Sequence, residues 1–292
     1  MKKFRPVEEI LSPSEPHMVG DGFKVVNYYP NGKNFSDRMS PFFLMDFNPE
    51  FNFSPTDFPR GVGVHPHRGF ETVTIAYKGS VAHNDSAGNS GVINPGDVQW
   101  MTAASGILHK EYHEKEFAEK GGAFEMVQLW VNLPKKYKMA SPHYQAILHE
   151  QKGKIDLPAN AGKAYIIAGE YNGIKGAAKT FSPVELYDIR LNENGEIELN
   201  VPAEYNTGLL VVEGEVTINQ NAIASQHQYA QFKNEDGLIK IKATRKSNIL
   251  FLSGEPINEP VAAYGPFVMN TFEEIQQALS DVKSGKFGTL AN

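Results

Sequence analysis

The sequence predicts an all-β protein made of two similar β-barrels, and three observations support this fold class. Short runs rich in Val, Ile, Tyr and Phe recur along the chain, with Gly and Pro residues between them. Helical periodicity is clear at one place, near the C-terminal end. Segments in the first half of the chain also resemble segments in the second half, which suggests two copies of one β fold.

Several runs are expected to form strands, because they are bounded by turn residues and some alternate between apolar and polar residues. They are residues 71–77, 124–133, 162–171, 185–191, 207–219, 237–243 and 247–254. Many short strands at close spacing are typical of a sandwich or a barrel.

A short C-terminal helix is expected over 271–284. Thr271 lies three residues before Glu274, which is the spacing of a capping box, and apolar residues follow at helical spacing. Gly285 then provides a stop signal.

Two pairs of segments carry the internal repeat. The segment "YKGSVAHND" (77–85) resembles "VEGEVTINQ" (212–220), and "MVQLWVNLP" (126–134) resembles "ILFLSGEP" (249–256). In the first pair an apolar run leads to Gly79 or Gly214 and a second run follows, so a hairpin is expected in each half.

The repeat predicts a boundary between two domains. The N-terminal domain is expected at 1–140 and the C-terminal domain, which includes the helix, at 150–292. The linker between them would fall within 138–154, "KMASPHYQAILHEQKGK".

Composition excludes several kinds of site. The chain has 292 residues, of which 41% are hydrophobic and 21% charged, and this is ordinary for a soluble globular protein. It has no cysteine, so disulfides, thiolate metal sites and Cys nucleophiles are excluded. The net charge of −6 and the lack of a dense Lys/Arg block argue against direct contact with nucleic acid. No signal peptide or membrane helix is apparent, so we expect a cytoplasmic protein with no membrane partner.

A candidate metal site is formed by two short motifs. "VHPHRGFE" (64–71) contains His65 and His67, and "GILHKEYHE" (106–114) contains His109 and Glu111. Residues two apart in a strand point to the same face, so each motif aims two side chains in one direction. A small barrel could bring the two pairs together in its mouth.

This set of side chains suits a transition metal. Three neutral imidazoles and one carboxylate are accepted by Fe, Mn, Ni, Cu and Zn. Four protein ligands on an octahedral ion leave two positions open, and open positions are what catalysis at a metal requires. A single HxH motif is more often structural, but two such pairs on strand-like segments favour a metal site.

The same motifs resemble the signature of the pirin family, within the cupin superfamily. The resemblance covers "HPHRGFETV", "NPGDVQWMTAASGILHKE", "VQLWVNLP" and "GPFVMNTFEEI", which together span most of the chain. It implies a bicupin, with two jelly-roll-like β-barrels face to face and an iron in the N-terminal one. Carried over by motif, the metal ligands are His65, His67, His109 and Glu111.

Glu71 is an alternative carboxylate. The general cupin pattern HxHxxxE would select Glu71, whereas the pirin resemblance selects Glu111, which we favour. Glu71 shares parity with His65 and His67, so spacing does not exclude it. We expect it to support a ligand or to form part of the wall.

The C-terminal half is expected to lack metal ligands. Matching the hairpins places Asn200 and Pro202 opposite His65 and His67. Matching "GLIKIK" to "GILHKE" places Lys240 and Lys242 opposite His109 and Glu111, and ammonium groups do not bind a cation. Five further histidines were weighed and set aside: His83, His113, His143, His149 and His227. His113 shares parity with His109 and Glu111 and could line the pocket rim, but a surface role is favoured for it.

The resemblance implies a dioxygenase like quercetin 2,3-dioxygenase, an oxidoreductase that cleaves flavonols with O2. One divalent metal, Fe(II) by preference, with Ni, Mn, Cu and Zn as alternatives, would bind a flavonol-like aromatic substrate. Glu111 would be the catalytic base that takes the substrate's hydroxyl proton. The alternative is an iron-dependent, redox-sensing regulator that acts through a protein partner, as eukaryotic pirins are described as transcriptional co-regulators. A Zn or Mn isomerase or hydrolase is a third, weaker reading, and a monomer is expected.

Overall fold

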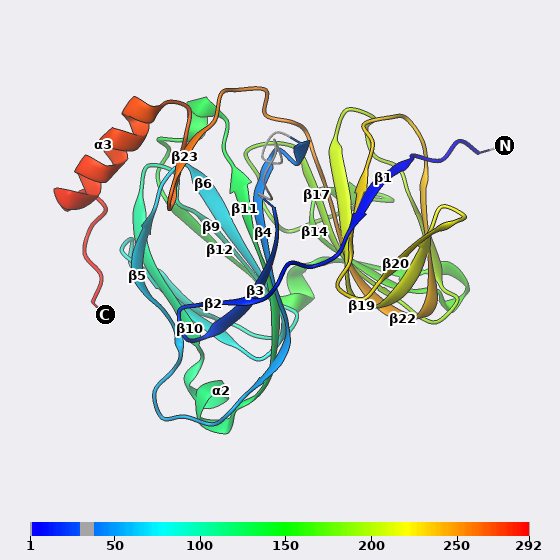
Figure 1. Cartoon of the computed structure of the whole chain (residues 1–292), viewed down its shortest axis with the longest axis horizontal. Coiled ribbons are helices and arrows are strands. Elements are labelled where there is room, and N and C mark those ends of the chain that lie inside the picture. Colours follow the sequence, from blue (N-terminus) through cyan, green and yellow to red (C-terminus); the bar gives the residue numbers. More distant parts are fainter. Residues whose placement is uncertain (1, 30–37, 292) are drawn as a thin grey trace. The chain divides into compact units, whose positions relative to one another are not determined.

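The computed structural model describes residues 2–29 and 38–291 and confirms the all-β fold class (Figure 1). The chain divides into two compact units. Among the described residues, the unit that we call the histidine barrel comprises 15–29, 42–149 and 257–291. The unit that we call the aliphatic barrel comprises 2–14, 38–41 and 150–256.

The histidine barrel is built from two main sheets. The larger sheet has the order β12-β9-β6-β11-β4-β3-β2 and the smaller has the order β5-β10-β7-β8. The larger sheet consists of β2 (His17–Val19), β3 (Phe23–Tyr29), β4 (Phe42–Phe53), β6 (Phe70–Lys78), β9 (Val98–Thr102), β11 (Gly122–Asn132) and β12 (His143–Ile147). The smaller sheet consists of β5 (Gly61–His67), β7 (Val81–Asp85), β8 (Ser90–Ile93) and β10 (Ile107–His113).

Short elements complete this unit. They are α2 (Lys115–Lys120), the 3-10 turn η1 (Lys135–Tyr137), the hairpin of β23 (Ala262–Tyr264) and β24 (Phe267–Met269), and α3 (Phe272–Lys283). The capping box that was expected at Thr271 and Glu274 is present, which confirms the C-terminal helix. No helix within 2–29 and 38–291 is long and apolar enough to cross a bilayer.

The aliphatic barrel is one large sheet, with β1-β21-β19-β22-β17-β14-β13 as its main order, β18 paired to β22 and β20 paired to β19. Its strands are β1 (Val7–Leu11), β13 (Gly153–Leu157), β14 (Gly162–Ala168), β17 (Val184–Leu191), β18 (Glu196–Leu199), β19 (Asn206–Ile218), β20 (Ala222–Ser225), β21 (Tyr229–Phe232) and β22 (Ile239–Gly254). The remaining elements are β15 (Glu170–Tyr171), β16 (Ile174–Lys175) and the 3-10 turns η2 (His149–Gln151) and η3 (Pro158–Asn160).

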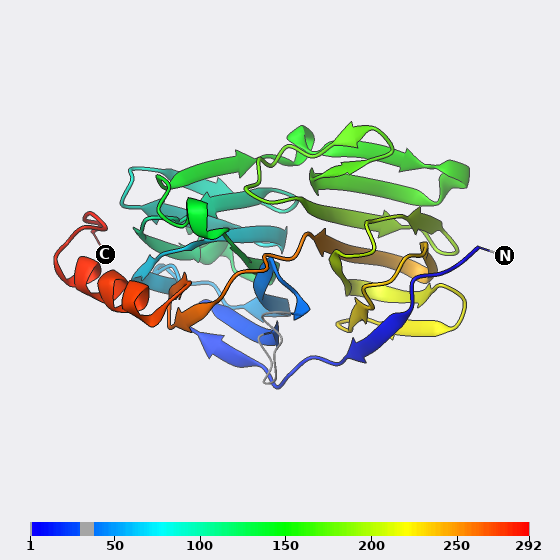
Figure 2. The same ribbon diagram turned by 90° about the horizontal axis from the view of Figure 1, so that it is seen from above.

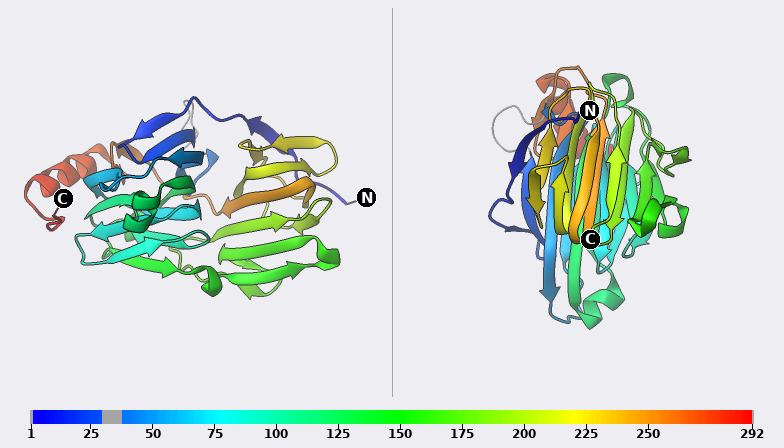
Figure 3. Two further views of the ribbon diagram at one scale, coloured as in Figure 1. Left: turned by 90° about the horizontal axis from the view of Figure 1, so that it is seen from below. Right: turned by 90° about the vertical axis from the view of Figure 1, so that its right-hand side faces the viewer.

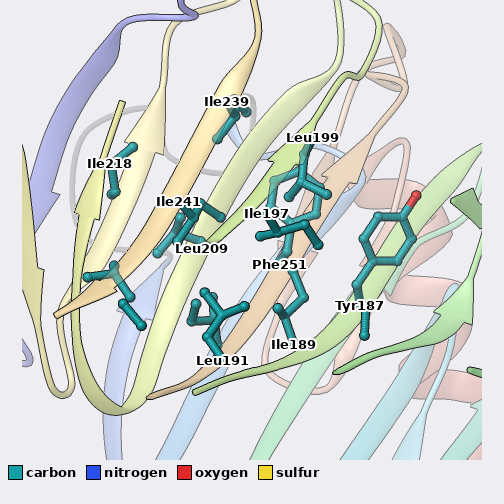
Figure 4. Close-up of a cluster of buried hydrophobic side chains, with 14 of the residues drawn as sticks. Tyr187, Ile189, Leu191, Ile197, Leu199, Leu209, Ile218, Ile239, Ile241 and Phe251 are labelled. Carbon is teal, nitrogen blue, oxygen red and sulfur yellow. The ribbon is translucent and has the colours of Figure 1, made fainter. Parts of the chain in front are cut away.

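The inside of the aliphatic barrel is filled by apolar side chains. Figure 4 shows Ile197 and Leu199 of β18 beside Ile241 and Phe251 of β22, and all four are buried. Each fully buried aliphatic or aromatic side chain contributes about 1.5–3 kcal/mol by leaving water. This cluster therefore explains the stability of the unit without a ligand.

The two ends of the chain are exchanged between the units. β1 pairs with β21 of the aliphatic barrel, beside the yellow strands in Figure 3. α3 packs through Ile275 and Ala278 on the histidine barrel and lies beside its strands in Figure 2. This differs from the domains expected at 1–140 and 150–292. Residues 2–14 belong to the same unit as 150–256, and residues 257–291 belong to the same unit as 42–149.

A buried ion pair fixes α3 to the histidine barrel. Arg68, directly after β5, donates to Asp281 of α3 at 2.9 Å, and both side chains are almost fully buried. The Arg68 guanidinium also donates to the carbonyl of Ser105 and stacks on the ring of Phe287. Because the charges are paired and satisfied by hydrogen bonds, this contact is a specific anchor for the helix.

The expected hairpins at Gly79 and Gly214 are wrong. β6 and β7 flank Gly79 but belong to different sheets, and Gly214 lies within the single strand β19. Both glycines have a positive φ, of +71° and +93°, which a residue with a Cβ adopts with strain. They are corners at which the chain bends from one side of a barrel to the other.

Two further expectations differ from the structure. The runs 237–243 and 247–254 form one strand, β22, because the residues between them continue the ladder with β19 through register shifts. The boundary between the two units falls at 149/150, within the expected linker 138–154, but this segment also holds β12, which pairs with β9, and the start of β13. Residues 244–246, between the two runs, and the residues of β12 are too polar to be recognised as strand residues by periodicity alone.

Candidate metal centre

The strands β5 and β10 bring the two histidine motifs together. They pair antiparallel with His109 opposite His65 and Ile107 opposite His67. The register then shifts so that Glu111 lies opposite Val62, which places one extra residue in β5. Such a bulge bends the strand and redirects side chains, and bulges are common beside functional sites.

The three imidazoles of these motifs form a compact cluster. The ring centroids of His65 and His109 are 4.2 Å apart, those of His67 and His109 are 4.6 Å apart, and those of His65 and His67 are 4.9 Å apart. One nitrogen from each ring lies within 4.8 Å of the others. This is an arrangement that could hold a metal ion.

Hydrogen bonds define which nitrogens face the cluster. Nδ1 of His65 lies 2.8 Å from the carbonyl of Gly63, and Nδ1 of His67 lies 3.4 Å from that of Pro266. A carbonyl can only accept, so Nδ1 is the donor in both rings and Nε2 keeps its lone pair. A backbone carbonyl on the second nitrogen is the usual support of a metal-binding histidine.

His109 provides the clearest sign of an absent partner. It is fully buried, and neither of its ring nitrogens has a hydrogen-bond partner among the described residues. Burial, with the neighbouring histidines next in importance, holds the pKa of His109 and of His67 well below the usual range. The rings are therefore neutral, as metal ligands must be. The donor set fits a transition metal.

Glu111 is held by neutral donors. The Gln128 Nε2 donates to both carboxylate oxygens, at 3.2 and 3.0 Å, and the Thr74 hydroxyl donates to Oε1 at 3.3 Å. Glu111 forms a second group of candidate ligands with His83 and His109, all within 4.8 Å, so His109 is common to both groups. The four expected ligands are therefore divided between two groups that share His109: His65 and His67 are in one, and Glu111 is in the other.

His83 is the residue that sequence reasoning missed. It is buried, lies opposite Glu111 in the β7–β10 ladder, and has its Nε2 3.4 Å from Asp85 and its Nδ1 3.0 Å from the amide of Gln99. The only signal in the sequence was the alternation of His83 and Asp85 on one strand, which became informative once β7 was known to lie beside β10.

A pocket of about 240 Å³ opens onto the candidate site. Its polar lining comes from His65, His67, Glu111, Gln128, Asp46 and Asn48. Its apolar wall is formed by Val19, Phe23, Val25, Val62, Met126, Trp130 and Pro266. The Trp130 ring meets the His67 ring edge to face at a centroid distance of 5.2 Å. A mostly apolar pocket with a few converging polar groups is typical of a small-molecule site.

Glu71 does not line this pocket. It is buried in β6, where it accepts a hydrogen bond of 2.7 Å from Thr102, and burial raises its pKa to about 7. Side chains alternate along a strand, so Glu71 points away from the face on which Thr74 contacts Glu111. His113 is not at the surface, contrary to expectation: it is buried among Phe rings and bonded to the carbonyl of Gly22.

The register expected for the C-terminal half is also wrong. Ile241 pairs with Ile197 as His109 pairs with His65, and Ile239 pairs with Leu199 as Ile107 pairs with His67. The counterparts of the four candidate ligands are therefore Ile197, Leu199, Ile241 and Ala243, all in the apolar core. Lys240 and Lys242 point the other way, and Lys240 forms an ion pair with Glu196. Both groups of candidate ligands found within 2–29 and 38–291 lie in the histidine barrel.

Comparisons with known proteins agree with this fold. The family model described as "Pirin" matches residues 22–131, and that described as "Pirin C-terminal cupin domain" matches residues 186–288. A Pseudomonas aeruginosa protein named "putative quercetin 2,3-dioxygenase" is 45% identical over 271 residues, covering 93% of this chain and 94% of that protein. Human pirin is 37% identical over 257 residues, covering 86% of this chain and 84% of that protein.

A solved structure is similar over nearly the whole chain. The crystal structure of quercetin 2,3-dioxygenase from Acinetobacter baumannii has a TM-score of 0.94 and 45% sequence identity. The alignment covers 99% of this chain and 100% of that one.

Proposed function

Because this chain belongs to the pirin family, we propose that it is a metal-dependent dioxygenase of the quercetin 2,3-dioxygenase type. Its substrate class would be flavonol-like aromatic compounds that carry a hydroxyl beside a carbonyl, with O2 as the second substrate. The observation that carries the proposal is the buried His109, whose two ring nitrogens have no partner among the described residues and whose ring lies against those of His65 and His67.

The residues that would hold the metal are His65, His67 and His109, with Glu111 as the proposed fourth ligand. The three histidines present lone pairs to one another, and Glu111 lines the same pocket as His65 and His67. Imidazole and carboxylate ligands favour a metal such as Fe(II), and Ni, Mn, Cu and Zn accept the same set. The metal, when bound, would supply a Lewis acid and the redox partner for O2.

Glu111 would also be the base. Its carboxylate is oriented by Gln128 and Thr74 at the edge of the pocket. It can accept the proton of a substrate hydroxyl on a second lone pair of Oε2, which accepts from Gln128 alone among the described residues. The proton moves from the substrate oxygen to the carboxylate, which leaves the substrate as an electron-rich enolate. Trp130, Val62 and Met126 line the same pocket and would exclude water from this anion.

The pocket favours catalysis over the alternative of a redox-sensing regulator. A regulator that reports its metal state to a protein partner has no need of a cavity at the ligands, whereas an enzyme needs room for its substrate. The cavity of about 240 Å³ at His65, His67 and Glu111 supports the enzyme.

The test is oxygen uptake by the iron-loaded protein on addition of quercetin. We expect one O2 consumed per quercetin by the wild type and none by His109→Ala. The matched control is His143→Ala, which removes an exposed histidine outside both candidate groups and is expected to behave as the wild type. No uptake by a wild type that is shown to hold its iron would reject the dioxygenase and favour the regulator.

A further inference from the structure

Asn48 is the one polar residue of the pocket with both side-chain atoms unused. Its side chain is 1% exposed, and neither Oδ1 nor Nδ2 has a hydrogen-bond partner among the described residues. A buried amide without partners costs about 1–3 kcal/mol, so such groups usually meet a ligand or an ordered water. Because Asn48 lines the pocket, a bound molecule can reach it.

The position of Asn48 separates it from the candidate metal ligands. Asp46 lies opposite Gln128 in the β4–β11 ladder, and Gln128 holds Glu111. Asn48 is two residues farther along β4, opposite Met126. Two residues span about 7 Å of strand, so the amide lies at a different end of the pocket from the Glu111–Gln128 contact.

Packing does not explain this amide. The residue at the same place in the aliphatic barrel is Ile189, which pairs with Ile249 as Asn48 pairs with Met126. Ile189 is fully buried in the apolar core and is labelled in Figure 4. The fold accepts an aliphatic side chain at this position, so the amide has a role that the fold itself does not require.

The neighbour of Asn48 makes this end of the pocket more polar. Asp46 accepts a hydrogen bond of 2.7 Å from Asn27, and burial raises the pKa of Asp46. The rest of the wall near Asn48 is apolar, with Val25 and Met126 in the lining. A ligand here would have an aromatic body with an oxygen substituent directed at β4.

We infer that Asn48 is a specificity-determining residue that binds a second oxygen substituent of the substrate, remote from the group that meets Glu111. The amide offers a donor and an acceptor, and a phenolic hydroxyl can use both. The site would thus prefer polyhydroxylated aromatic ketones over those with a single hydroxyl. This inference rests on the proposed function for the substrate class.

The experiment compares two ligands on the iron-loaded protein under nitrogen, so that binding is measured without turnover. Quercetin and 3-hydroxyflavone share the hydroxyl beside the carbonyl, and only quercetin has further hydroxyls. Calorimetric titration of the wild type should give a Kd for quercetin about tenfold lower than for 3-hydroxyflavone. Asn48→Leu, close in size, should weaken quercetin about tenfold and change 3-hydroxyflavone by less than about twofold.

The controls separate specificity from damage. Asn52→Leu replaces an exposed amide of the same strand and should keep the wild-type ratio. Iron content should be unchanged in both variants, and neither should unfold at a lower temperature than the wild type. If Asn48→Leu does not fold, Asn48→Ala removes the amide without added bulk and carries the same expectation.

The outcomes distinguish this inference from the proposed function. Equal binding of the two flavonols by the wild type, no binding of either, or an unchanged ratio in Asn48→Leu would overturn the role of Asn48. An altered ratio in a protein that takes up no oxygen would keep that role and reject the dioxygenase. Oxygen uptake with an unchanged ratio would do the reverse.

Discussion

The two barrels of this chain place opposite kinds of side chain at the same positions. Strand pairing matches each member of the polar set in the histidine barrel to an apolar residue in the aliphatic barrel. The matched pairs are His65 and Ile197, His67 and Leu199, His109 and Ile241, Glu111 and Ala243, Thr74 and Leu209, Gln128 and Phe251, Asp46 and Tyr187, and Asn48 and Ile189.

This difference indicates that the fold does not require the polar residues of the histidine barrel. The aliphatic barrel has the same strand pairings and fills its interior with apolar side chains (Figure 4). Each buried polar group in the histidine barrel costs free energy unless it is paired, and His109 and Asn48 are not paired among the described residues. His109 and Asn48 therefore lower the stability of the apo barrel, and a bound ligand would supply the partners that they lack.

The largest effect is expected from converting His109 to its counterpart. His109→Ile should reduce metal affinity by about 100- to 1,000-fold, or about 3–4 kcal/mol, because roughly 10–16 kcal/mol of metal binding would be shared among the four proposed ligands. The apo protein should unfold at the same temperature as the wild type or higher, since an unpaired imidazole becomes an aliphatic group. Elemental analysis and calorimetry check both expectations.

The mirror substitution tests the comparison from the other side. Ile241→His places an imidazole in the aliphatic core, with apolar Ile197 and Ile218 as its cross-strand neighbours. We expect a loss of about 4 kcal/mol in the free energy of unfolding, from lost apolar burial and an unpaired polar group. An Ile241→His protein as stable as the wild type would contradict the expected cost of a buried, unpaired imidazole in this barrel.

A smaller effect is expected from Glu71. Its counterpart in the aliphatic barrel is Asn206, because each residue lies eight positions before the corner glycine of its barrel, Gly79 or Gly214. Glu71 has a native pKa of about 7, raised by burial from 4.5. Between these values the native state keeps a proton that the unfolded state releases, so this group lowers stability as pH rises from 4.5 to 7. Glu71→Gln should remove this loss, which is on the order of 3 kcal/mol.

Urea unfolding of the apo proteins at pH 4.5, 6 and 7.5 measures this effect. The variant is compared with the wild type at each pH, so that the contributions of all other titratable groups cancel. The difference should grow with pH. Glu193→Gln, at an exposed residue, should show no such trend. A constant difference across the range would mean that Glu71 is ionised in the native state.

The smallest effect is expected from changing Gln128, which donates hydrogen bonds to Glu111. Gln128→Leu removes the donor to both carboxylate oxygens and should lower metal affinity about tenfold, the lower end of the range for groups that orient a ligand. Competition with a chelator measures it. Gln99→Leu, which removes a contact to His83, should change affinity less. The reverse order would identify His83 as the fourth ligand in place of Glu111.

The parts of the site that the sequence predicted are those encoded locally. The alternation of His65 with His67, and of His109 with Glu111, gives each pair a common direction, and the resemblance supplied the ligand set. The capping box at Thr271 was visible for the same reason, because helix caps depend on residues three apart.

The parts that could not be predicted depend on which strands become neighbours. Gln128, Asp46 and Asn48 reach the pocket because β11 and β4 pair at one register, and a shift of one residue would turn them outward. Gly214 resembled a hairpin because a corner and a turn use the same positive φ. No local pattern in the sequence predicts that the N-terminal residues belong to the aliphatic barrel and the C-terminal residues to the histidine barrel.

Because residues 257–291 belong to the histidine barrel, this barrel can be completed only at the end of synthesis. The ribosome makes the strands that carry His65, His109 and Glu111 first, then about a hundred residues of the other barrel, and only then β23, β24 and α3. At about 5–20 residues per second, roughly 5–20 s pass before Pro266 can support His67 and Asp281 can meet Arg68. Until then the nascent histidine barrel holds His67 without its carbonyl partner, so the proposed metal site would be completed only near the end of translation.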